Sequence, residues 1–393
     1  MSLEKISLSC RRCYIDATSI TWTGSHTFLS DFIDSFPPSS AFEFILIIHS
    51  GQEVYINHTV SSCFRIVIIE HQVPLVFPTK LARKSIFFCL LGLESFFSGR
   101  GNIDLLIVNT SAILLPFSLS CVKIWHNSIH LRPDLYEKLL LTMPCRWLRF
   151  KIEMFLDHVT VPYYRRHCFP SHYIFNLVSR IHSSIIDSTV VPHSLSYLAS
   201  ISPHYPKYRT LFCSSNHSIS LLYVAALESY KNHHIILDAL DQLNASGYVV
   251  NLVLVGPIVS PSVLNYVESS SSFLSGRVKV LGRIPKTQVF ELMQKSSFSL
   301  AFSDSETFGY TIPESLRFCL PVIALDRESN LQFGLDSVIT VSSSDDFYEL
   351  LLQFLDMRLN YAAYSLAAYE SYLRLINSYP ASIPTVLRYI QNL

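Results

Sequence analysis

Short apolar runs alternate with segments of helical spacing through the second half of the chain. The runs are too continuous to alternate between a buried and an exposed face, a pattern typical of parallel strands covered on both sides. A segment long enough for a helix follows most runs, which favours a doubly wound α/β domain. The predicted strands are residues 221–227, 250–256, 278–284, 298–304, 320–326 and 337–343, and the predicted helices are residues 232–245, 262–273, 286–295, 313–318 and 345–355.

The first half carries a looser version of the same alternation. Residues 194–218 are rich in Ser, Pro and Tyr and are predicted to link the two halves. The fold class is therefore α/β, with two Rossmann-like doubly wound domains facing each other across a cleft. We assign residues 1–200 to the first domain and 218–356 to the second, followed by C-terminal helices over 357–393. In the first half the predicted strands are residues 5–10, 43–48, 64–69, 104–109, 121–125, 159–162 and 185–191, and the predicted helices are residues 26–35, 79–97, 135–156 and 172–181.

Composition excludes several other classes of protein. The 393 residues include 49% hydrophobic and 15% charged side chains, which rules out a mainly disordered chain. Lys and Arg number 30 against 30 Asp and Glu, so the chain lacks the basic surplus with which nucleic-acid-binding proteins neutralise phosphates. The apolar stretches are interrupted before the roughly 18–20 residues that a membrane-spanning helix needs. The first residues contain no long apolar run, so we expect no secretory signal and a cytoplasmic protein.

The sequence predicts no metal site. Its nine cysteines are scattered and mostly lie in apolar runs, where a reduced cysteine behaves as a small hydrophobic residue. Cys10 and Cys13 form a C-x-x-C pair without the second pair that a zinc site needs. His126 and His130 have helical spacing, but no third ligand accompanies them in the nearby sequence.

Glycines mark the strand ends where a ligand is expected. In open parallel sheets, ligands bind beyond the carboxyl ends of the strands, where loops enter helices whose N-termini attract anions. The chain has 11 glycines, fewer than an average composition contains. Candidates for a close backbone approach to a ligand are the glycines at predicted strand ends, Gly24, Gly256, Gly282 and Gly309.

The segment 298–326 carries the most informative pattern. A buried strand ends in a polar turn that contains Glu306, and Gly309 follows it. A helix then begins near Pro313 and Glu314, because proline suits the first turn of a helix. The backbone amides of that turn suit a phosphate group. Two carboxylates, eight residues apart, therefore flank a predicted anion-binding turn.

This arrangement resembles the retaining glycosyltransferases of the GT-B fold, in the family 4-like group called glycosyl transferases group 1. The group carries an E-x7-E element, and residues 306–314, ETFGYTIPE, match it, including the aromatic-glycine pair Phe308-Gly309. The resemblance is good over about residues 220–345. Further likenesses lie at residues 223–232, 252–256, 280–284 and 321–324, and in the first half at residues 23–25, 124–127 and 191–193.

The resemblance implies a chemical role for each matching residue. Glu306 would contact hydroxyls of the donor sugar and stabilise the positive charge at its anomeric carbon, with His126 near the transferred sugar. Glu314 would bind the ribose of the nucleotide, and Lys231 would neutralise the diphosphate leaving group. Further donor contacts are implied for the backbone amides of Phe308, Gly309 and Tyr310, and for Gly24, Gly256 and Arg283.

The same resemblance implies the reaction. A sugar would pass from a UDP- or GDP-linked donor to a saccharide or lipid-linked acceptor with retention of configuration, as in polysaccharide biosynthesis. Neither a metal nor a cofactor would be needed, and residues 357–393 would pack back on the first domain. Physical reasoning supports part of this, because a lysine and a helix N-terminus opposite a carboxylate match the charge separation of a departing diphosphate.

Two alternatives stay open because the chain departs from the family pattern. Ala225 and Ala226 stand where the family usually has Gly-Arg, so one of two basic diphosphate ligands is absent. Arg283 is a candidate replacement. One alternative is a non-catalytic descendant that binds a nucleotide sugar or a glycan. The other is a sugar-nucleotide isomerase on the same scaffold, although it would lack the E-x7-E context.

Structural interpretations stay open for individual residues as well. Glu314 completes a T-x-x-E capping box, Lys231 could be a solvated surface residue, and His126 could serve packing alone. The basic and aromatic segment 163–167, with further basic residues over 146–151, has two interpretations. It is either a solvated surface or a contact with an anionic membrane, which would make the protein peripheral.

Overall fold

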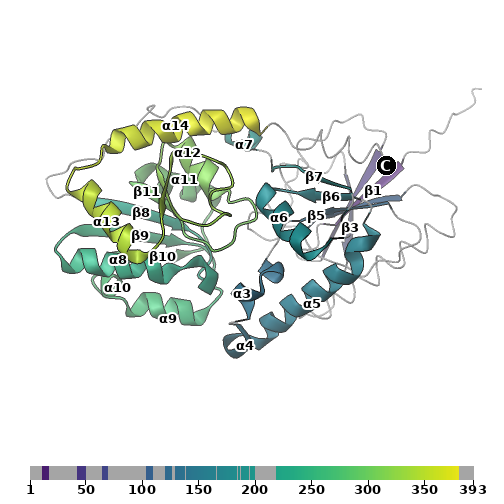
Figure 1. Cartoon of the computed structure of the whole chain (residues 1–393), viewed down its shortest axis with the longest axis horizontal. Helices are drawn as coiled ribbons and strands as arrows, with labels where there is room; N and C mark the ends of the chain where they lie inside the picture. Colours follow the sequence, from purple (N-terminus) through teal and green to yellow (C-terminus); the bar gives the residue numbers. More distant parts are fainter. Residues whose placement is uncertain are drawn as a thin grey trace, which may run out of the picture. The chain divides into compact units, whose positions relative to one another are not determined.

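The computed structural model describes residues 11–16, 42–49, 64–69, 103–108, 120–125, 129–137, 139–164, 166–183, 185, 187–193, 195–199 and 218–379. The chain divides into two compact units (Figure 1). The first comprises Met1–Ser194 with Ala381–Leu393, and the second comprises Leu195–Pro380. Each unit contains a parallel sheet.

The described part of the first unit is built on seven parallel strands. They pair in the order β3-β2-β1-β4-β5-β6-β7. Tyr14 lies opposite Ile45 on one side and Leu105 on the other, so β1 is an interior strand of the sheet. The strands are β1 (Arg11–Asp16), β2 (Phe42–His49), β3 (Phe64–Ile69), β4 (Ile103–Val108), β5 (Ser120–Ile124), β6 (Arg166–Phe169) and β7 (Ser188–Val190).

The helices of the first unit differ in two places from the sequence prediction. The predicted helix 135–156 is interrupted, because Pro144 starts a new helix instead of continuing the one before it. The predicted strand 159–162 is wrong, since helix α5 continues to Thr160 and a 3-10 turn follows. The described helices are η3 (Ile129–Leu131), α3 (Pro133–Tyr136), α4 (Leu139–Thr142), α5 (Pro144–Thr160), η4 (Val161–Tyr163) and α6 (His172–Ile181).

A buried charge cluster ties β5 to α5. Asp157 on α5 binds the ammonium of Lys123 with one oxygen, and its other oxygen lies 2.6 Å from His130 Nε2. Burial disfavours the carboxylate, but Lys123 and His130 outweigh this effect and lower the pKa of Asp157 to about 2. Lys123 Nζ also lies 4.0 Å from the ring centre of Trp125. These contacts determine which face of α5 turns inward.

The described part of the second unit is built on six parallel strands. They pair in the order β10-β9-β8-β11-β12-β13. Every apolar run predicted in this half of the chain contributes a strand. Burial on both faces of the sheet is complete in β12, whereas the edge strand β10 exposes Lys279 and Leu281. The strands are β8 (Ser218–Val224), β9 (Val249–Val255), β10 (Val278–Gly282), β11 (Phe298–Ala301), β12 (Val322–Leu325) and β13 (Val338–Val341).

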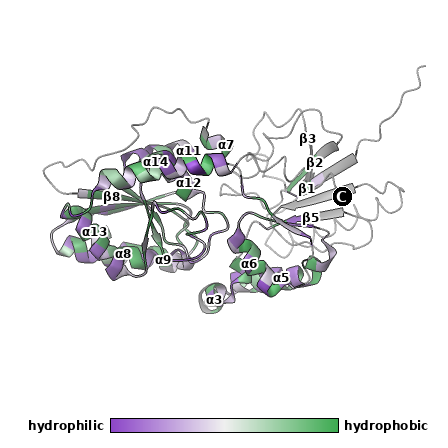
Figure 2. Ribbon diagram, turned by 45° about the horizontal axis from the view of Figure 1, so that its top comes forward, coloured by the Kyte–Doolittle hydropathy of each residue, from purple (hydrophilic) through white to green (hydrophobic). Residues whose placement is uncertain are grey.

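The helices of the second unit begin where the local sequence favours a helix start. Pro261 is the first residue of α9. At the start of α13 the Ser343 side chain accepts a hydrogen bond from the Asp346 amide, and the Asn360 side chain caps α14 in the same way. Helices α8 and α13 carry both hydrophilic and hydrophobic residues (Figure 2). No helix of the described residues is long and apolar enough to cross a membrane. The helices are α7 (Ser196–Ala199), η5 (Ser229–Lys231), α8 (His233–Ala245), α9 (Pro261–Ser269), α10 (Ser271–Leu274), α11 (Lys286–Lys295), α12 (Thr311–Arg317), α13 (Ser344–Leu355) and α14 (Tyr361–Ser378).

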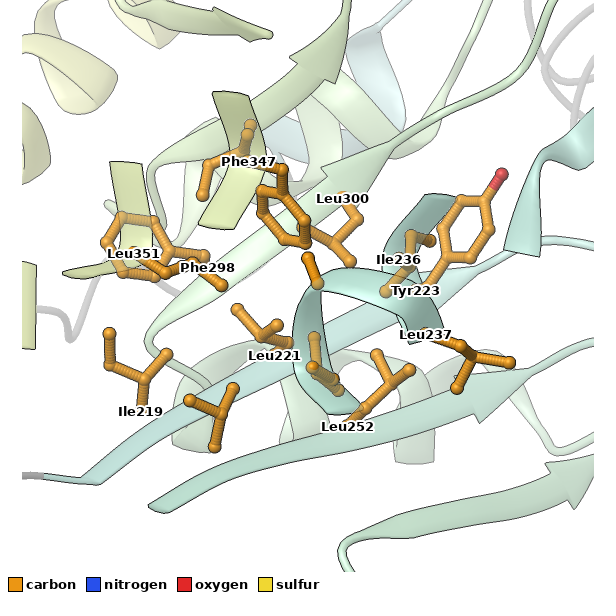
Figure 3. Packing of buried hydrophobic residues seen from close by; sticks show 14 of the residues in the cluster. Ile219, Leu221, Tyr223, Ile236, Leu237, Leu252, Phe298, Leu300, Phe347 and Leu351 are labelled. Carbon is orange, nitrogen blue, oxygen red and sulfur yellow. The ribbon is translucent and has the colours of Figure 1, made fainter. Parts of the chain in front are cut away.

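Apolar side chains from the sheet and from helices α8 and α13 form the main core of the second unit (Figure 3). Leu221 and Leu300 lie on neighbouring central strands and are fully buried. The ring of Phe298 lies 4.8 Å from that of Phe354 and 5.3 Å from that of Tyr361. Burying one such side chain contributes about 1.5–3 kcal/mol. This core holds the strand ends in place.

A second cluster corrects two predictions about the flanks of this unit. Residues 194–218 were predicted to be a linker, but Leu195 and Leu198 are buried in a cluster with Leu316 of α12. The C-terminal segment 357–393 was predicted to pack on the first domain. This prediction is wrong for helix α14, which packs on α12 within the second unit. Residues 381–393 belong to the first unit, and their contacts lie outside the described part.

We expect Gly256→Ala to lower the free energy of unfolding by about 2–4 kcal/mol. Gly256 follows β9 with φ of 149°, and a Cβ there would lie 2.1 Å from the carbonyl oxygen of Ala225. The backbone of one strand end must therefore move. Urea unfolding followed by circular dichroism measures the change.

Gly276→Ala is the matched control for this prediction. Its φ of 73° is also positive, but nothing lies within 4 Å of an added Cβ. We expect a loss of about 1 kcal/mol from the backbone conformation alone. Equal losses in the two variants would contradict the steric explanation.

Candidate functional site

The strand order of the second unit reverses between β8 and β11. From these two neighbouring strands the chain continues toward opposite edges of the sheet. Open α/β sheets bind ligands at such a topological switch point, beyond the carboxyl ends of the strands. The connection after β8 ends at Lys231, and the loop after β11 carries Glu306. The side-chain amide of Asn232 donates to the carbonyl of Phe302 at 3.0 Å. This hydrogen bond ties the two connections together.

Lys231 and Glu306 form an ion pair at this point. Lys231 Nζ lies 2.5 Å from Glu306 Oε1, and the Ser303 hydroxyl donates to the same oxygen at 2.5 Å. Burial disfavours the ammonium, but the charge of Glu306 outweighs this and raises the pKa of Lys231 above its usual value. Lys231 is buried, so its interpretation as a solvated surface residue is wrong. The site therefore holds a fixed positive charge beside a carboxylate.

Neighbouring groups hold the backbone at Lys231. The Tyr223 hydroxyl donates to the Lys231 carbonyl at 2.7 Å, and burial raises the pKa of Tyr223. Asn232 follows in a left-handed conformation, with φ of 52°, before α8 begins. The imidazole of His233 packs on Tyr223, with ring centres 5.1 Å apart. The position of the lysine is thus determined by a buried tyrosine and a sharp backbone turn.

The second carboxylate, Glu314 on α12, is only 3% exposed. Its Oε1 pairs with the ammonium of Lys286, the first residue of α11, and accepts a hydrogen bond from the Tyr197 hydroxyl at 2.6 Å. The capping-box interpretation is wrong, because no side chain caps α12 and the carboxylate contacts these two partners instead.

The two carboxylates share one arrangement. In each, a lysine ammonium and a hydroxyl bind Oε1. Within the described part of the chain, Oε2 of Glu306 and Oε2 of Glu314 accept no hydrogen bond. A carboxylate oxygen is a strong acceptor. Each group can therefore receive a hydroxyl from a ligand while its position is held by protein partners.

The backbone conformation of Gly309 and contacts of Phe308 stabilise the turn between the two carboxylates. Gly309 has a φ of 71°, a conformation that glycine adopts without steric cost. The Phe308 ring lies 4.9 Å from the ring of Tyr310, and the Phe308 carbonyl accepts from the Gln332 side chain at 2.9 Å. The predicted site residues of this turn are thus adjacent to Glu306.

The remaining predicted site residues have different outcomes. The Gly256 amide donates to the Gly282 carbonyl at 2.8 Å, which places Gly256 at the joined ends of β9 and β10. Arg283 is exposed and forms no ion pair with a described residue. His126 and Gly24 lie outside the described residues. Among the described residues, no group of three or more His, Cys, Asp or Glu side chains could hold a metal ion.

Three partners of the carboxylates are not among the predicted site residues. Ser303 lies at the end of the predicted strand 298–304, and this position at a strand end could have indicated a site residue. Lys286 begins the helix after β10, so its place at a strand end could have drawn attention to it. Tyr197 lies in the segment predicted to be a linker, and its local sequence carries no signal.

The second half of the chain contains a match to a known family. Residues 214–370 match the family described as Glycosyl transferases group 1. The match spans about two fifths of the chain and includes the described strands of the second unit. A comparison with curated protein sequences found no match.

Solved structures resemble the whole chain. HepE of Anabaena, in complex with UDP and glucose, is 13% identical with a TM-score of 0.62, over 98% of this chain and 100% of that chain. Sucrose-phosphate synthase of Thermosynechococcus elongatus is 12% identical with a TM-score of 0.67, over 97% and 98%. A glycosyltransferase of Rickettsia africae is 11% identical with a TM-score of 0.62, over 98% of each chain. The predicted GT-B glycosyltransferase fold, α/β with parallel sheets, is confirmed.

We expect His233 to make the stability of the chain depend on pH. Burial, with the nearby charge of Lys231, lowers the pKa of His233 to about 4. Between about pH 6.5 and pH 4 the unfolded chain therefore binds a proton that the folded chain does not, so stability falls as the pH falls. Between pH 7 and pH 4.5, His233 lowers the free energy of unfolding by about 2–3 kcal/mol.

Urea unfolding of His233→Leu at these two pH values tests this. Between pH 7 and pH 4.5, the free energy of unfolding of the variant should fall by about 2–3 kcal/mol less than that of the wild type. His234→Leu, at the exposed neighbour, is the matched control and should keep the wild-type pH dependence. An unchanged dependence in His233→Leu would contradict the assignment.

Proposed function

We propose that this chain is a retaining, family 4-like glycosyltransferase that moves a sugar from a nucleotide-diphosphate donor to a saccharide or lipid-linked acceptor. The observation that carries the proposal is the Lys231–Glu306 ion pair at the switch point, inside a segment that matches glycosyl transferases group 1. The donor is a UDP- or GDP-linked hexose, and no metal or cofactor takes part. A UDP-linked donor is supported by the HepE structures in complex with UDP and with UDP-glucose.

The proposed reaction separates charge between the sugar and the diphosphate. The bond from the anomeric carbon to the diphosphate oxygen breaks, which leaves a positive sugar and a negative leaving group. Lys231 neutralises the diphosphate, together with backbone amides of residues 308–310. Glu306 Oε2 accepts a sugar hydroxyl, and the carboxylate stabilises the positive charge. The acceptor oxygen attacks from the face that the diphosphate leaves and passes its proton to it, so the configuration is retained.

Other residues complete the proposed donor site. Glu314 binds the ribose hydroxyls, and His126 is assigned a contact with the transferred sugar. Gly24 and Gly256 allow close approach of the backbone to the donor. Arg283 supplies a second positive charge that Ala226 cannot provide.

Binding of a nucleotide sugar or glycan without turnover is the second candidate function. It is favoured by Ala226, which stands where the family usually places a basic residue. Lys231 is already paired with Glu306, so less positive charge is available to a leaving diphosphate. A sugar-nucleotide isomerase is less favoured, because it has no need of the E-x7-E element.

We expect Glu306→Gln to reduce turnover about 10²–10³-fold, because a neutral amide cannot stabilise the positive charge on the sugar. Nucleotide binding should persist, since Lys231 remains. The assay follows release of UDP or GDP from a panel of nucleotide sugars with mixed acceptors, and proton NMR of the product gives the anomeric configuration.

Glu291→Gln, at an exposed position of α11, is the matched control and should keep full turnover. Unchanged turnover in Glu306→Gln, or inversion of the anomeric centre, would contradict the mechanism. Nucleotide binding without turnover by the wild-type protein across the panel would favour the second candidate function.

Peripheral contact with an anionic membrane is part of the proposal, but α5 supports it better than residues 163–167. In that segment Tyr164 and His167 are buried, and Arg166 pairs with Asp187 at 2.9 Å. On α5 an apolar stripe is exposed instead, formed by Leu148 (51%), Phe155 (64%) and Val159 (44%).

Charge on α5 favours lipid phosphates over a cationic partner. Both carboxylates of the helix, Glu153 and Asp157, are buried, whereas the side chains of Arg149 and Lys151 reach the surface, where Arg149 pairs with Glu153 and Lys151 with Glu137 of the preceding segment. Exposed apolar residues beside basic ones suit the headgroup region of an anionic bilayer.

We expect the protein to float with vesicles of equal parts phosphatidylglycerol and phosphatidylcholine. The double variant Leu148→Ser, Phe155→Ser should lose most of this recovery, because the apolar stripe can no longer enter the headgroup region. Leu274→Ser, at a residue of the second unit that is 75% exposed, is the matched control and should float like the wild type. Wild-type protein that stays in the aqueous fraction would contradict the membrane contact.

A further inference from the structure

We propose that Tyr197 and Lys286 are positioning residues that make the donor site selective for ribonucleotides, by aiming the unused oxygen of Glu314 at the ribose diol. The inference rests on the proposed function and adds two residues that lie outside the E-x7-E element.

Both partners compensate for the burial of the Glu314 carboxylate. A carboxylate removed from water loses its hydration, and only close donors and a counter-ion compensate for that loss. Lys286 supplies the counter-charge and Tyr197 supplies a hydroxyl, and both bind Oε1. If the cluster served stability alone, partners on both oxygens would satisfy the buried group better. Because both partners bind Oε1, Oε2 can accept a hydrogen bond from a ligand.

Tyr197 is held rigidly although it precedes the sheet of the second unit. Its neighbours Leu195 and Leu198 are buried against α12 and α14. The Leu198 carbonyl accepts a hydrogen bond from Arg317 Nε at 3.2 Å. The Tyr197 ring also lies 6.3 Å from the ring of Tyr310, in the turn between the two carboxylates. A hydroxyl anchored in this way restricts rotation of the Glu314 carboxylate.

Lys286 is positioned by aromatic rings as well as by charge. Its Nζ lies 5.5 Å from the ring centres of both Tyr197 and Phe290. The side chain is 43% exposed, so the ammonium stays hydrated on one side while it holds Glu314. The ammonium binds Oε1, so Oε2 of the carboxylate remains a strong acceptor for a ribose hydroxyl.

The recognised chemistry is therefore the 2′,3′-diol of a ribonucleoside diphosphate. One carboxylate oxygen can accept from either hydroxyl of the diol, and a 2′-deoxyribose offers one of these donors fewer. A hydrogen bond to a charged group contributes about tenfold to a hundredfold in affinity. The wild-type protein should accordingly bind UDP or GDP at least about tenfold more tightly than the 2′-deoxy form of the same nucleotide.

Isothermal titration calorimetry of the full chain with UDP, GDP, dUDP and dGDP tests the inference. In Tyr197→Phe and Lys286→Met we expect affinity for the ribonucleotide to fall about tenfold, while affinity for the deoxynucleotide changes little. The ratio of the affinity for the ribonucleotide to the affinity for the deoxynucleotide should therefore approach one. Lys286→Arg keeps the positive charge and should retain most of the wild-type preference.

Lys279→Gln, at an exposed position of β10, is the matched control for loss of a lysine in the same unit. Variants that weaken both sugar forms equally, and so keep the wild-type ratio, would overturn the positioning role even if they are less stable. Tyr197→Phe removes one oxygen atom, so it also tests the role should Lys286→Met fail to fold. If the wild-type protein binds none of the four nucleotides, the proposed function itself fails.

Discussion

A positive charge buried beside a negative one is the interaction on which the site of the second unit depends. The Lys231 ammonium stays charged away from water because Glu306 compensates for the hydration that it loses. The pair can form because the connections after β8 and β11 meet where the strand order reverses. The hydroxyls of Tyr223 and Ser303 then hold the lysine backbone and the carboxylate in place.

Glu306 and Glu314 use the same arrangement for different purposes in the proposed reaction. Each has one oxygen bound by a lysine and a hydroxyl and a second oxygen that can receive a ligand. When a diphosphate binds Lys231, Glu306 loses part of its counter-charge and gains the positive charge that develops on the sugar. Donor binding would thus exchange one ion pair for another. Lys286 keeps its pairing with Glu314, which suits a group that binds ribose and takes no part in bond breaking.

The correct and the incorrect predictions differ in the kind of contact on which they depend. The inner strands of the second unit are recognisable because burial on both faces demands continuous apolar runs, and Glu306 and Glu314 follow the buried strand β11 at a spacing that the family shares. The strand predicted at 159–162 is helical, because α5 is stabilised by the buried contacts of Asp157 with β5 and η3. Residues 195–199 resemble a linker, yet they are packed on α12.

The sequence by itself determined the alternation of strands and helices, the α/β class and the position of both carboxylates along the chain, because these follow from local periodicity and motif spacing. Only the tertiary structure decided which groups meet those carboxylates. Tyr197 and Lys286 are separated from Glu314 by 117 and 28 residues, and no local pattern records that distance. Their meeting depends on strand order and on the packing of α7 and α11 around the sheet, which arise only when the whole unit is folded.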